Sequence, residues 1–383
     1  MERKGRREDF PSRTKETIAS EKPDSQGWTN YICFNTETVD TGRMDFYAVP
    51  IGYTYGSHGS VVNYFDPASY NPRSLTTAAA LKPFYSSTAI PKSATFVASG
   101  SSLFCIGGVV FLPEFNQKPS STMYRLEKTT GSSSTNKGGF FCSKTKMLSP
   151  RDRSSAIAMG GKLYIIGGYT AEGSHEVSGG HWAEVFDPYS ESSLPLPPPP
   201  LVNIEDKFDI VTAALHSSKQ IFVASRQSNV AYLYDVVEGI WEKLDIRTDL
   251  SSFVVGQAAV VGKATLCWYQ DGTQQLVAYD LDLKMWFRHR IRGLEKFGKR
   301  CSRFSPCLSS LLSLDGDHLC LIWRDCMMPH PRTGGPVFHF TKVHVSIRLD
   351  ARGKPILDAF AISSKSCVLK QNASLCSALT HTE

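Results

Sequence analysis

The sequence predicts an all-β fold in which six four-stranded units form a β-propeller, and three observations support this prediction. The runs LFCIGG (103–108) and LYIIGG (163–168) are apolar, rich in strand-forming residues and closed by two glycines, and they stand 60 positions apart. A second series of strand-like runs accompanies them: NYFDP (63–67), MYRLE (123–127), EVFDP (184–188), YLYDV (232–236), AYDLD (278–282) and VHVSI (343–347). The composition, with 29 glycines, 21 prolines and 11% aromatic residues, is typical of short strands joined by many turns. A repeat of this length has room for four short strands, which make one propeller blade.

The chain divides in order into a tail, six blades and a second tail. Residues 1–27 mix basic and acidic side chains and contain no apolar stretch, so we expect a disordered N-terminal tail that is not a secretory signal. The propeller is expected over residues 28–362, with blades near 28–82, 83–148, 149–204, 205–250, 251–299 and 300–362. Residues 363–383 show no alternation of apolar and polar side chains, which predicts a loose C-terminal tail.

Glycine pairs and tryptophans have distinct expected roles in such a ring. Where a strand ends near the crowded axis, glycine permits a positive φ and a close approach of backbone that a Cβ would prevent. Trp241 and Trp286 end two of the strand repeats and would lie as apolar plates between neighbouring sheets. Closure of the ring needs a terminal strand, and we expect the segment Tyr31–Thr36 to pair with the final blade so that no edge stays open.

One segment carries a specific family resemblance. Residues 150–188, PRDRSSAIAMGGKLYIIGGYTAEGSHEVSGGHWAEVFDP, resemble a kelch repeat, and residues 94–127 resemble a degenerate second copy. The resemblance implies a kelch-type β-propeller, the architecture of galactose oxidase. Plant kelch proteins often carry an F-box before the propeller, a unit of about 40 or more residues, whereas about 27 precede Trp28 here. An F-box-related protein without the box is therefore expected.

Charge and hydropathy indicate an intracellular protein that binds neither nucleic acid nor membranes. The 42 basic and 36 acidic residues give a net charge of +6, with no basic cluster of the kind a nucleic-acid surface needs. The longest apolar stretch, Phe253–Tyr269, is interrupted by Gly256, Gln257, Gly262 and Lys263, so no membrane span is expected. Several of the ten cysteines sit inside apolar runs, as free thiols do, which predicts a cytoplasmic or nuclear location.

No pattern in the sequence identifies a metal site, a cofactor or a catalytic residue. The set Cys301, Cys307, Cys320 and Cys326 is nearly symmetric, but five residues between the first two exceed the usual spacing of a zinc site. Resemblance to galactose oxidase would imply copper held by two histidines and two tyrosines, yet His175 and His181 are expected in a loop. Phosphate-binding and serine-hydrolase motifs do not occur. The sequence therefore predicts a protein that is not an enzyme.

Candidate binding residues come from the loops around the channel mouth. In kelch propellers the arginine at a strand entry often points into this mouth, and Arg153 matches that position, with Arg151 beside it. Similar offsets from the next strand give Lys92, Lys207 and Arg303, a basic set suited to an acidic peptide. Glu172 and His175 are expected rim contacts in the loop 169–182. The alternative is that these are solvated loop charges. Trp182 is expected to pack against the adjacent blade.

These features together predict a non-catalytic protein–protein interaction module, of adaptor or substrate-receptor type, whose partner binds the loops at one face of the propeller. Two alternatives remain open at this stage. One is a divergent propeller enzyme, such as a metal-dependent oxidase or a sugar-handling protein, and the other is a decayed relative with little function. The fold by itself does not choose among them, because the same ring hosts binders and enzymes.

Overall fold

The computed structural model describes fourteen stretches of the chain: residues 31–38, 42–50, 61–64, 80–111, 117–128, 140–168, 181–200, 210–225, 230–246, 256–270, 273–297, 309–325, 335–369 and 373–381. Among them, one short 3₁₀ helix, η4 (Leu294–Phe297), is the sole helical element, and every other named element is a strand. Within these stretches, no helix has both the length and the apolar character required to cross a membrane.

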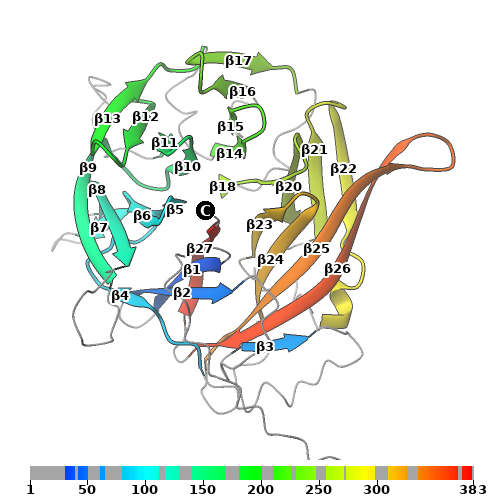
Figure 1. The fold of residues 1–383 in the computed structure, drawn as a ribbon, viewed down its shortest axis with the longest axis horizontal. Coiled ribbons are helices and arrows are strands. Elements are labelled where there is room, and N and C mark those ends of the chain that lie inside the picture. Colours follow the sequence, from blue (N-terminus) through cyan, green and yellow to red (C-terminus); the bar gives the residue numbers. More distant parts are fainter. Residues whose placement is uncertain are drawn as a thin grey trace, which may run out of the picture.

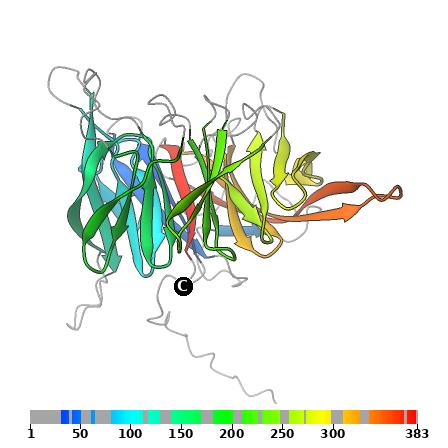
Figure 2. The same ribbon diagram turned by 90° about the horizontal axis from the view of Figure 1, so that it is seen from above.

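Six antiparallel sheets stand around a central axis, as the strand repeats predict (Figures 1 and 2). The first blade contains β27 (Ala373–His381), β1 (Tyr31–Thr38), β2 (Met44–Pro50) and β4 (Tyr85–Ser87). The second contains β5 (Thr95–Ser99), β6 (Ser102–Ile106), β8 (Gln117–Lys128) and β9 (Phe140–Arg151), with β7 (Val109–Phe111) also paired to β8. The third contains β10 (Ser155–Met159), β11 (Lys162–Ile166), β12 (Ala183–Asp187) and β13 (Ser192–Leu196).

The remaining three blades follow the same antiparallel order. The fourth contains β14 (Ile210–Leu215), β15 (Gln220–Ser225), β16 (Val230–Asp235) and β17 (Ile240–Leu244), with the short β18 (Gly256–Gln257) added parallel to β14. The fifth contains β19 (Ala259–Val261), β20 (Thr265–Gln270), β21 (Gln275–Asp280) and β22 (Met285–Arg290). The sixth contains β23 (Ser310–Asp315), β24 (His318–Asp325), β25 (Val337–Leu349) and β26 (Pro355–Val368), with β3 (Val61–Tyr64) at its outer edge. The long strands β25 and β26 project from the ring as an arm (Figure 2).

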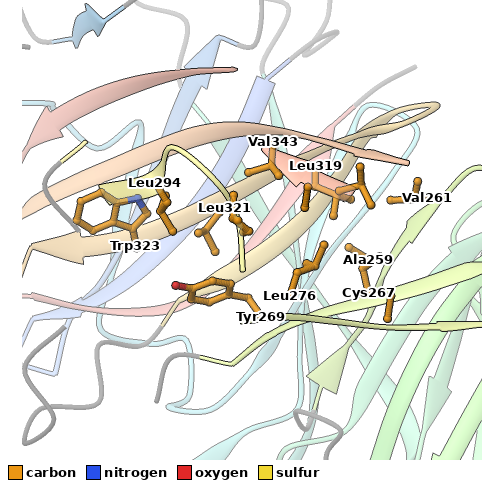
Figure 3. Close-up of a cluster of buried hydrophobic side chains, with 14 of the residues drawn as sticks. Ala259, Val261, Cys267, Tyr269, Leu276, Leu294, Leu319, Leu321, Trp323 and Val343 are labelled. Atoms are coloured by element: carbon orange, nitrogen blue, oxygen red, sulfur yellow. The ribbon is translucent and has the colours of Figure 1, made fainter. Parts of the chain in front are cut away.

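The hydrophobic core lies between the blades rather than at the axis. The described residues form six apolar clusters, and each cluster joins two neighbouring blades. Between the fifth and sixth blades, for example, Cys267 and Leu276 face Leu319, Leu321 and their neighbours (Figure 3). Each sheet is therefore apolar on both faces, and burial on both sides stabilises it by about 25 cal/mol for each Å² removed from water.

The tryptophan predictions agree with this arrangement. Trp241 on β17 packs against the cluster between the third and fourth blades, and Trp286 on β22 packs between the fourth and fifth. Trp182, immediately before β12, lies 5.6 Å from the Trp241 ring in an edge-to-face contact, so it packs against the adjacent blade as predicted.

The first and last blades differ from the prediction in several ways. The expected loose C-terminal tail is wrong over residues 373–381, because these residues form β27, the innermost strand of the first blade, paired along β1. β1 therefore stays in its own blade, and the closing strand comes from the other end of the chain. The strand near residue 63 was expected in the first blade, but β3 pairs with β26 of the sixth. The sheet region also extends to Val368, beyond the predicted end at residue 362. The expected N-terminal tail, residues 1–27, lies outside the described residues.

Candidate functional site

The innermost strands of all six blades line a central channel. Its cavity has a volume of about 1170 Å³ and is bordered mainly by small and hydroxyl-bearing residues from β27, β5, β10, β14, β19 and β23. Neighbouring innermost strands are cross-linked by hydroxyl groups near the axis: Thr95 donates to the carbonyl of Ser154, and the hydroxyls of Ser155 and Thr212 lie 2.5 Å apart. These hydroxyl groups therefore tie the start of the third blade's innermost strand to the innermost strands of the second and fourth blades.

The glycine pairs that follow β6 and β11 pack closely against the backbone that leads into the innermost strands β5 and β10. Gly107 and Gly108 have φ of 65° and 90°, and Gly167 and Gly168 have 64° and 92°, as the crowded-axis argument predicts. The ideal Cβ position at Gly168 lies 2.8 Å from the carbonyl oxygen of Asp152 and 3.0 Å from the nitrogen of Ser154. We define the face of the ring at which β5 and β10 begin as the entry face.

Alanine substitutions at Gly161 and Gly168 distinguish the cost of a left-handed backbone from the cost of a clash between the new Cβ and neighbouring backbone. Gly161 also has a positive φ, 76°, but nothing lies within 4 Å of its ideal Cβ. Gly161→Ala is expected to cost about 1–2 kcal/mol, the penalty of a left-handed backbone alone. Gly168→Ala should cost about 1–3 kcal/mol more, because its Cβ would overpack the entry backbone. Urea unfolding of both variants checks this order, and equal losses would show that the close approach at Gly168 is readily relieved.

Arg153 lies at the channel mouth on the entry face. Its backbone has a φ of 52°, in the left-handed region, and the residue lines the cavity. The side chain is 70% exposed, with Nε 3.8 Å from the Asp152 carboxylate. Burial raises the pKa of Asp152, while the Arg153 charge and a backbone hydrogen bond from Arg153 oppose that shift. The structure thus places Arg153 where a partner could reach it, and its binding role stays a prediction.

Lys92 is not the equivalent of Arg153 in the second blade. An ideal Cβ at Gly108 would meet the backbone of Lys92 and Ala94, just as one at Gly168 would meet that of Asp152 and Ser154. The residue that corresponds to Arg153 is therefore Ser93, which has a φ of 59° and lines the cavity. Lys92 instead forms an ion pair with Glu37 and lies 5.3 Å from the centre of the Phe111 ring. Lys92 therefore lies one residue before the position equivalent to Arg153, and its role as a partner contact stays a prediction.

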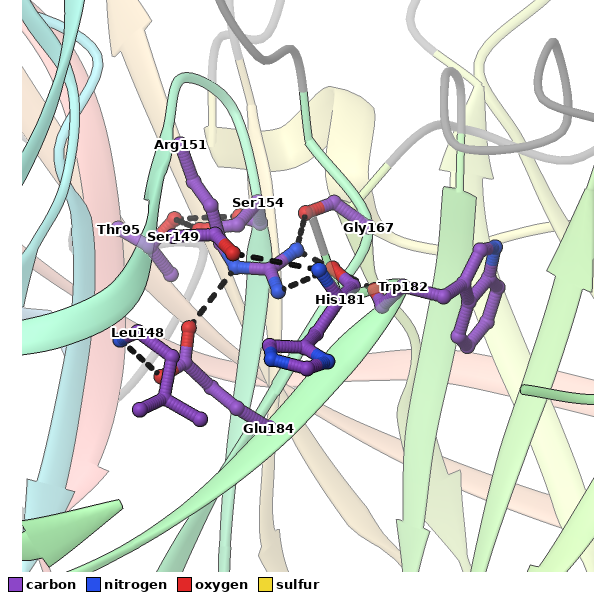
Figure 4. Close-up of polar contacts among 9 residues, drawn as sticks. All are labelled: Thr95, Leu148, Ser149, Arg151, Ser154, Gly167, His181, Trp182 and Glu184. Carbon is purple, nitrogen blue, oxygen red and sulfur yellow. Dashed lines mark hydrogen bonds and ion pairs between the residues drawn. The ribbon is translucent and has the colours of Figure 1, made fainter. Parts of the chain in front are cut away.

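Arg151 is a buried structural residue, so the prediction that it contacts a partner is wrong. Its side chain has no exposed surface, and Nε lies 3.1 Å from Oε1 of Glu184, which is also fully buried (Figure 4). The other guanidinium nitrogens donate to the carbonyls of Gly167 at 2.6 Å, His181 at 2.6 Å and Trp182 at 3.2 Å. Burial lowers the pKa of Arg151, and the Glu184 carboxylate opposes this shift. Arg151 thus joins the last strand of the second blade to the third.

The rest of the predicted basic mouth is not assembled by the described residues. Lys207, Arg303, Glu172 and His175 lie outside those residues. The charged groups that do line the cavity have both signs: Arg153 and Lys263 are accompanied by Glu37 and Asp315. The described part of the channel therefore carries mixed charge rather than a uniform positive field.

Of the four cysteines compared with a zinc site, the described residues include only Cys320. Cys320 is buried on β24 within the core between the sixth and first blades, and burial raises its pKa to about 12. Cys301, Cys307 and Cys326 lie outside the described residues. Burial also raises the pKa of Cys33 to about 12, and both thiols stay protonated at neutral pH.

Sequence reasoning missed two features. One is the Arg151–Glu184 pair, and the other is the approach of His318 on β24 to His344 on β25, which are partners in the strand register. The second had a readable signal, since HLCLIW (318–323) and VHVSI (343–347) were both recognised as strands. Pairing them as neighbours would have placed the two histidines opposite each other.

Comparisons with known proteins connect this geometry to a group of plant proteins. Residues 141–248 match a family described as a protein of unknown function, DUF1668. An F-box/kelch-repeat protein of Arabidopsis thaliana is 29% identical over 143 residues, which cover 37% of this chain and 31% of that protein. A putative one is 27% identical over 220 residues, 57% of this chain and 50% of its own length. A third is 26% identical over 238 residues, 60% of this chain and 53% of the relative.

These relatives agree with the kelch resemblance of residues 150–188 and with the six-bladed ring. The chain spans about half the length or less of the curated relatives it matches. It is similar to F-box/kelch-repeat proteins, at modest identity, and its fold is a six-bladed β-propeller.

Proposed function

We propose that this relative of F-box/kelch-repeat proteins is a non-catalytic protein–protein interaction module, an adaptor or substrate receptor that binds its partner on the entry face of the propeller. The observation that carries the proposal is the exposed Arg153 guanidinium, presented at the channel mouth by a left-handed backbone that Gly168 accommodates. A rigid ring that holds an exposed cation on its rim is suited to recognition, because the sheets need not move when a partner binds.

The chemistry of the channel supports binding more than catalysis. Cys267, which borders the cavity, is buried, and its pKa is raised by that burial, so the thiol is a poor nucleophile. The names of the relatives describe repeats and an F-box and mention no reaction. Arg153 can donate charge-assisted hydrogen bonds to a carboxylate, which favours an acidic segment as the partner's contact. We also propose a cytoplasmic or nuclear location, which the free cysteines of the described residues suit.

Replacing Arg153 tests the proposal without disturbing the core. Tagged wild type, Arg153→Ala and Arg352→Ala would be used for affinity purification from a plant extract. Arg352 is exposed at the turn of the β25–β26 arm, which projects from the ring, and serves as the control. Loss of a charge-assisted hydrogen bond, about 1.5–3 kcal/mol, should weaken the partner about tenfold or more in Arg153→Ala only.

The contact face can be checked on the same samples by cross-linking mass spectrometry. Lys92 lies on the entry face, whereas Lys263 lies in the β19–β20 turn at the opposite end of an innermost strand. We expect partner cross-links to Lys92 and not to Lys263. Partners retained in full by Arg153→Ala would overturn the proposed site. A small molecule or metal bound in the channel, in place of a protein partner on the entry face, would favour the alternative of a divergent propeller enzyme.

A further inference from the structure

The turn between β23 and β24 of the sixth blade brings two histidines and two aspartates together. His318 opens β24 and pairs in register with His344 on β25, so both side chains lie on the same face of the sheet. The two imidazole rings are 5.4 Å apart between their centres. Asp315 is the last residue of β23 and Asp317 lies in the turn that precedes His318, at the opposite end of β23 from the entry face. This group is therefore separate from Arg153.

The potential ligand atoms of three of these residues converge. Nδ1 of His318 lies 2.8 Å from Oδ1 of Asp317, and Nδ1 of His344 lies 3.1 Å from Oδ2 of the same carboxylate. One ligand atom from each of these three residues can be chosen so that all lie within 4.8 Å of one another. Zn²⁺ bound at about 2.0–2.1 Å by tetrahedral ligands separates neighbouring donor atoms by roughly 3.3 Å, so small side-chain rotations would bring these donors to the metal.

We propose that Asp317, His318 and His344 form a binding site for a divalent transition metal, with Zn²⁺ as the fitting ion. Two imidazoles and a carboxylate are a donor set that this ion accepts, whereas Mg²⁺ and Ca²⁺ prefer oxygen ligands alone. Three protein ligands leave a fourth position for water or a ligand. Asp317 is 53% exposed and the histidines 25% and 22%, so the open position faces solvent.

The elements around the group hold it in place. The backbone nitrogen of Val345 donates to the carbonyl of Asp317 at 2.8 Å, which fixes the turn against β25. The His344 ring packs 4.9 Å from the ring of Phe360 on the next strand. The two histidine ligands are carried on paired strands, which keep ligand geometry better than loops do.

Asp315 supplies further negative charge to the site. Its Oδ1 lies 2.6 Å from Nδ1 of His318, and its Oδ2 lies 3.8 Å from Nζ of Lys342. The Asp315 carboxylate and the ligand Asp317 together offset the two positive charges of the metal. Without metal, the same atoms would form only hydrogen bonds and ion pairs, with each histidine Nδ1–H donating to a carboxylate. Metal binding must displace these protons, and a binding experiment distinguishes the two states.

Isothermal titration of tag-free protein with ZnCl₂ tests the site. Wild type, His344→Ala and Asp317→Asn would be compared, with His216→Ala, a histidine on the channel wall, as the matched control. We expect wild type and His216→Ala to bind one more Zn²⁺ than the other two variants do. The affinity lost at this site should exceed the roughly 10–100-fold that removal of an outer-shell partner costs. MgCl₂ should give no comparable binding.

A melting experiment provides the second measurement. Zn²⁺ should raise the melting temperature of wild type and of His216→Ala, because binding to the folded state stabilises it, and should raise that of Asp317→Asn much less. Asp317 is exposed, so Asp317→Asn is expected to fold, and its circular dichroism without metal checks this. Equal Zn²⁺ stoichiometry and affinity in wild type, His344→Ala and Asp317→Asn would overturn the proposal, as would the absence of saturable Zn²⁺ binding to wild type.

Discussion

Replacing Arg151 with alanine is expected to destabilise the protein by about 3–5 kcal/mol, the usual cost of breaking a buried ion pair from one side. The Glu184 carboxylate would stay fully buried and lose the guanidinium 3.1 Å away. Glu184 would keep its hydrogen bond from the backbone nitrogen of Leu148 at 2.7 Å, but this neutral donor does not balance its charge. The carbonyls of Gly167, His181 and Trp182 would lose a donor as well. Urea unfolding followed by tryptophan fluorescence measures the loss.

Two further variants identify the cause of that loss. Arg153→Ala, only two residues away but exposed, should change the free energy of unfolding by less than about 0.5 kcal/mol. The double variant Arg151→Met, Glu184→Leu should recover only part of the stability, because it removes both buried charges but leaves the three carbonyls and the Leu148 amide without their side-chain partners. If Arg151→Ala unfolds at the same urea concentration as wild type, the Arg151–Glu184 pair does not contribute to the stability of the protein. Arg151→Ala is also unsuitable for a binding assay, since unfolding would mimic a lost contact.

Deleting residues 373–383 is expected to lower stability by several kcal/mol and to promote association between chains. The deletion removes β27, and with it Leu375 and Leu379, two buried side chains that contribute about 1.5–3 kcal/mol each. It also leaves β1 as an open sheet edge, which is a template for pairing with another chain. Thermal melting and size-exclusion chromatography measure the two effects.

Addition of the missing strand as a peptide provides the control. A synthetic peptide of residues 370–383 should restore the melting temperature of the shortened protein by pairing with β1, and a scrambled peptide of the same composition should not. Unchanged melting and an unchanged elution volume after the deletion would contradict the closing role of β27.

The blade pattern could be predicted because its signals are local. The glycine pairs at 107–108 and 167–168 mark strand ends where a positive φ is required, and this requirement is met within a few residues of each pair. Five of the six strand-like runs in the second series form the third strand of their own blade, β8, β12, β16, β21 and β25. The sixth, near residue 63, has the same local pattern but pairs with β26 of the last blade. Nothing in its local sequence indicates which strand it pairs with.

The C-terminal strand was missed because a bulge hides its alternation. In the pairing with β1, Asn35 faces Ser377 and Thr36 faces Leu375, so Cys376 is an extra residue in β27. Leu375 consequently packs toward the sixth blade and Leu379 toward the second, although four residues separate them. A strand without a bulge would show both leucines on one face.

Sequence reasoning located candidate-site residues from local motifs, but it could not identify contacts between residues that lie far apart in the chain. Arg153 was placed from its match to the kelch pattern. Arg151 was assigned to the same loop, but it is the last residue of β9, where Met147, Ser149 and Arg151 alternate as buried side chains. The strand period indicates burial there. Glu184, its partner 33 residues away, becomes its neighbour only through packing between blades.

The way β27 completes the first blade sets a time order for folding during synthesis. Asn35 and its partner Ser377 are 342 residues apart, so β1 is made long before the strand that covers its inner edge. At about 5–20 residues per second, roughly 17–70 s of translation separate the two. The second to fifth blades can form their sheets within that interval. The first blade stays incomplete, because Leu379 is missing from the apolar cluster between the first and second blades. During that interval the ring is open at the inner edge of β1. This unpaired strand edge is the longest-exposed one during synthesis, and a chaperone would bind there.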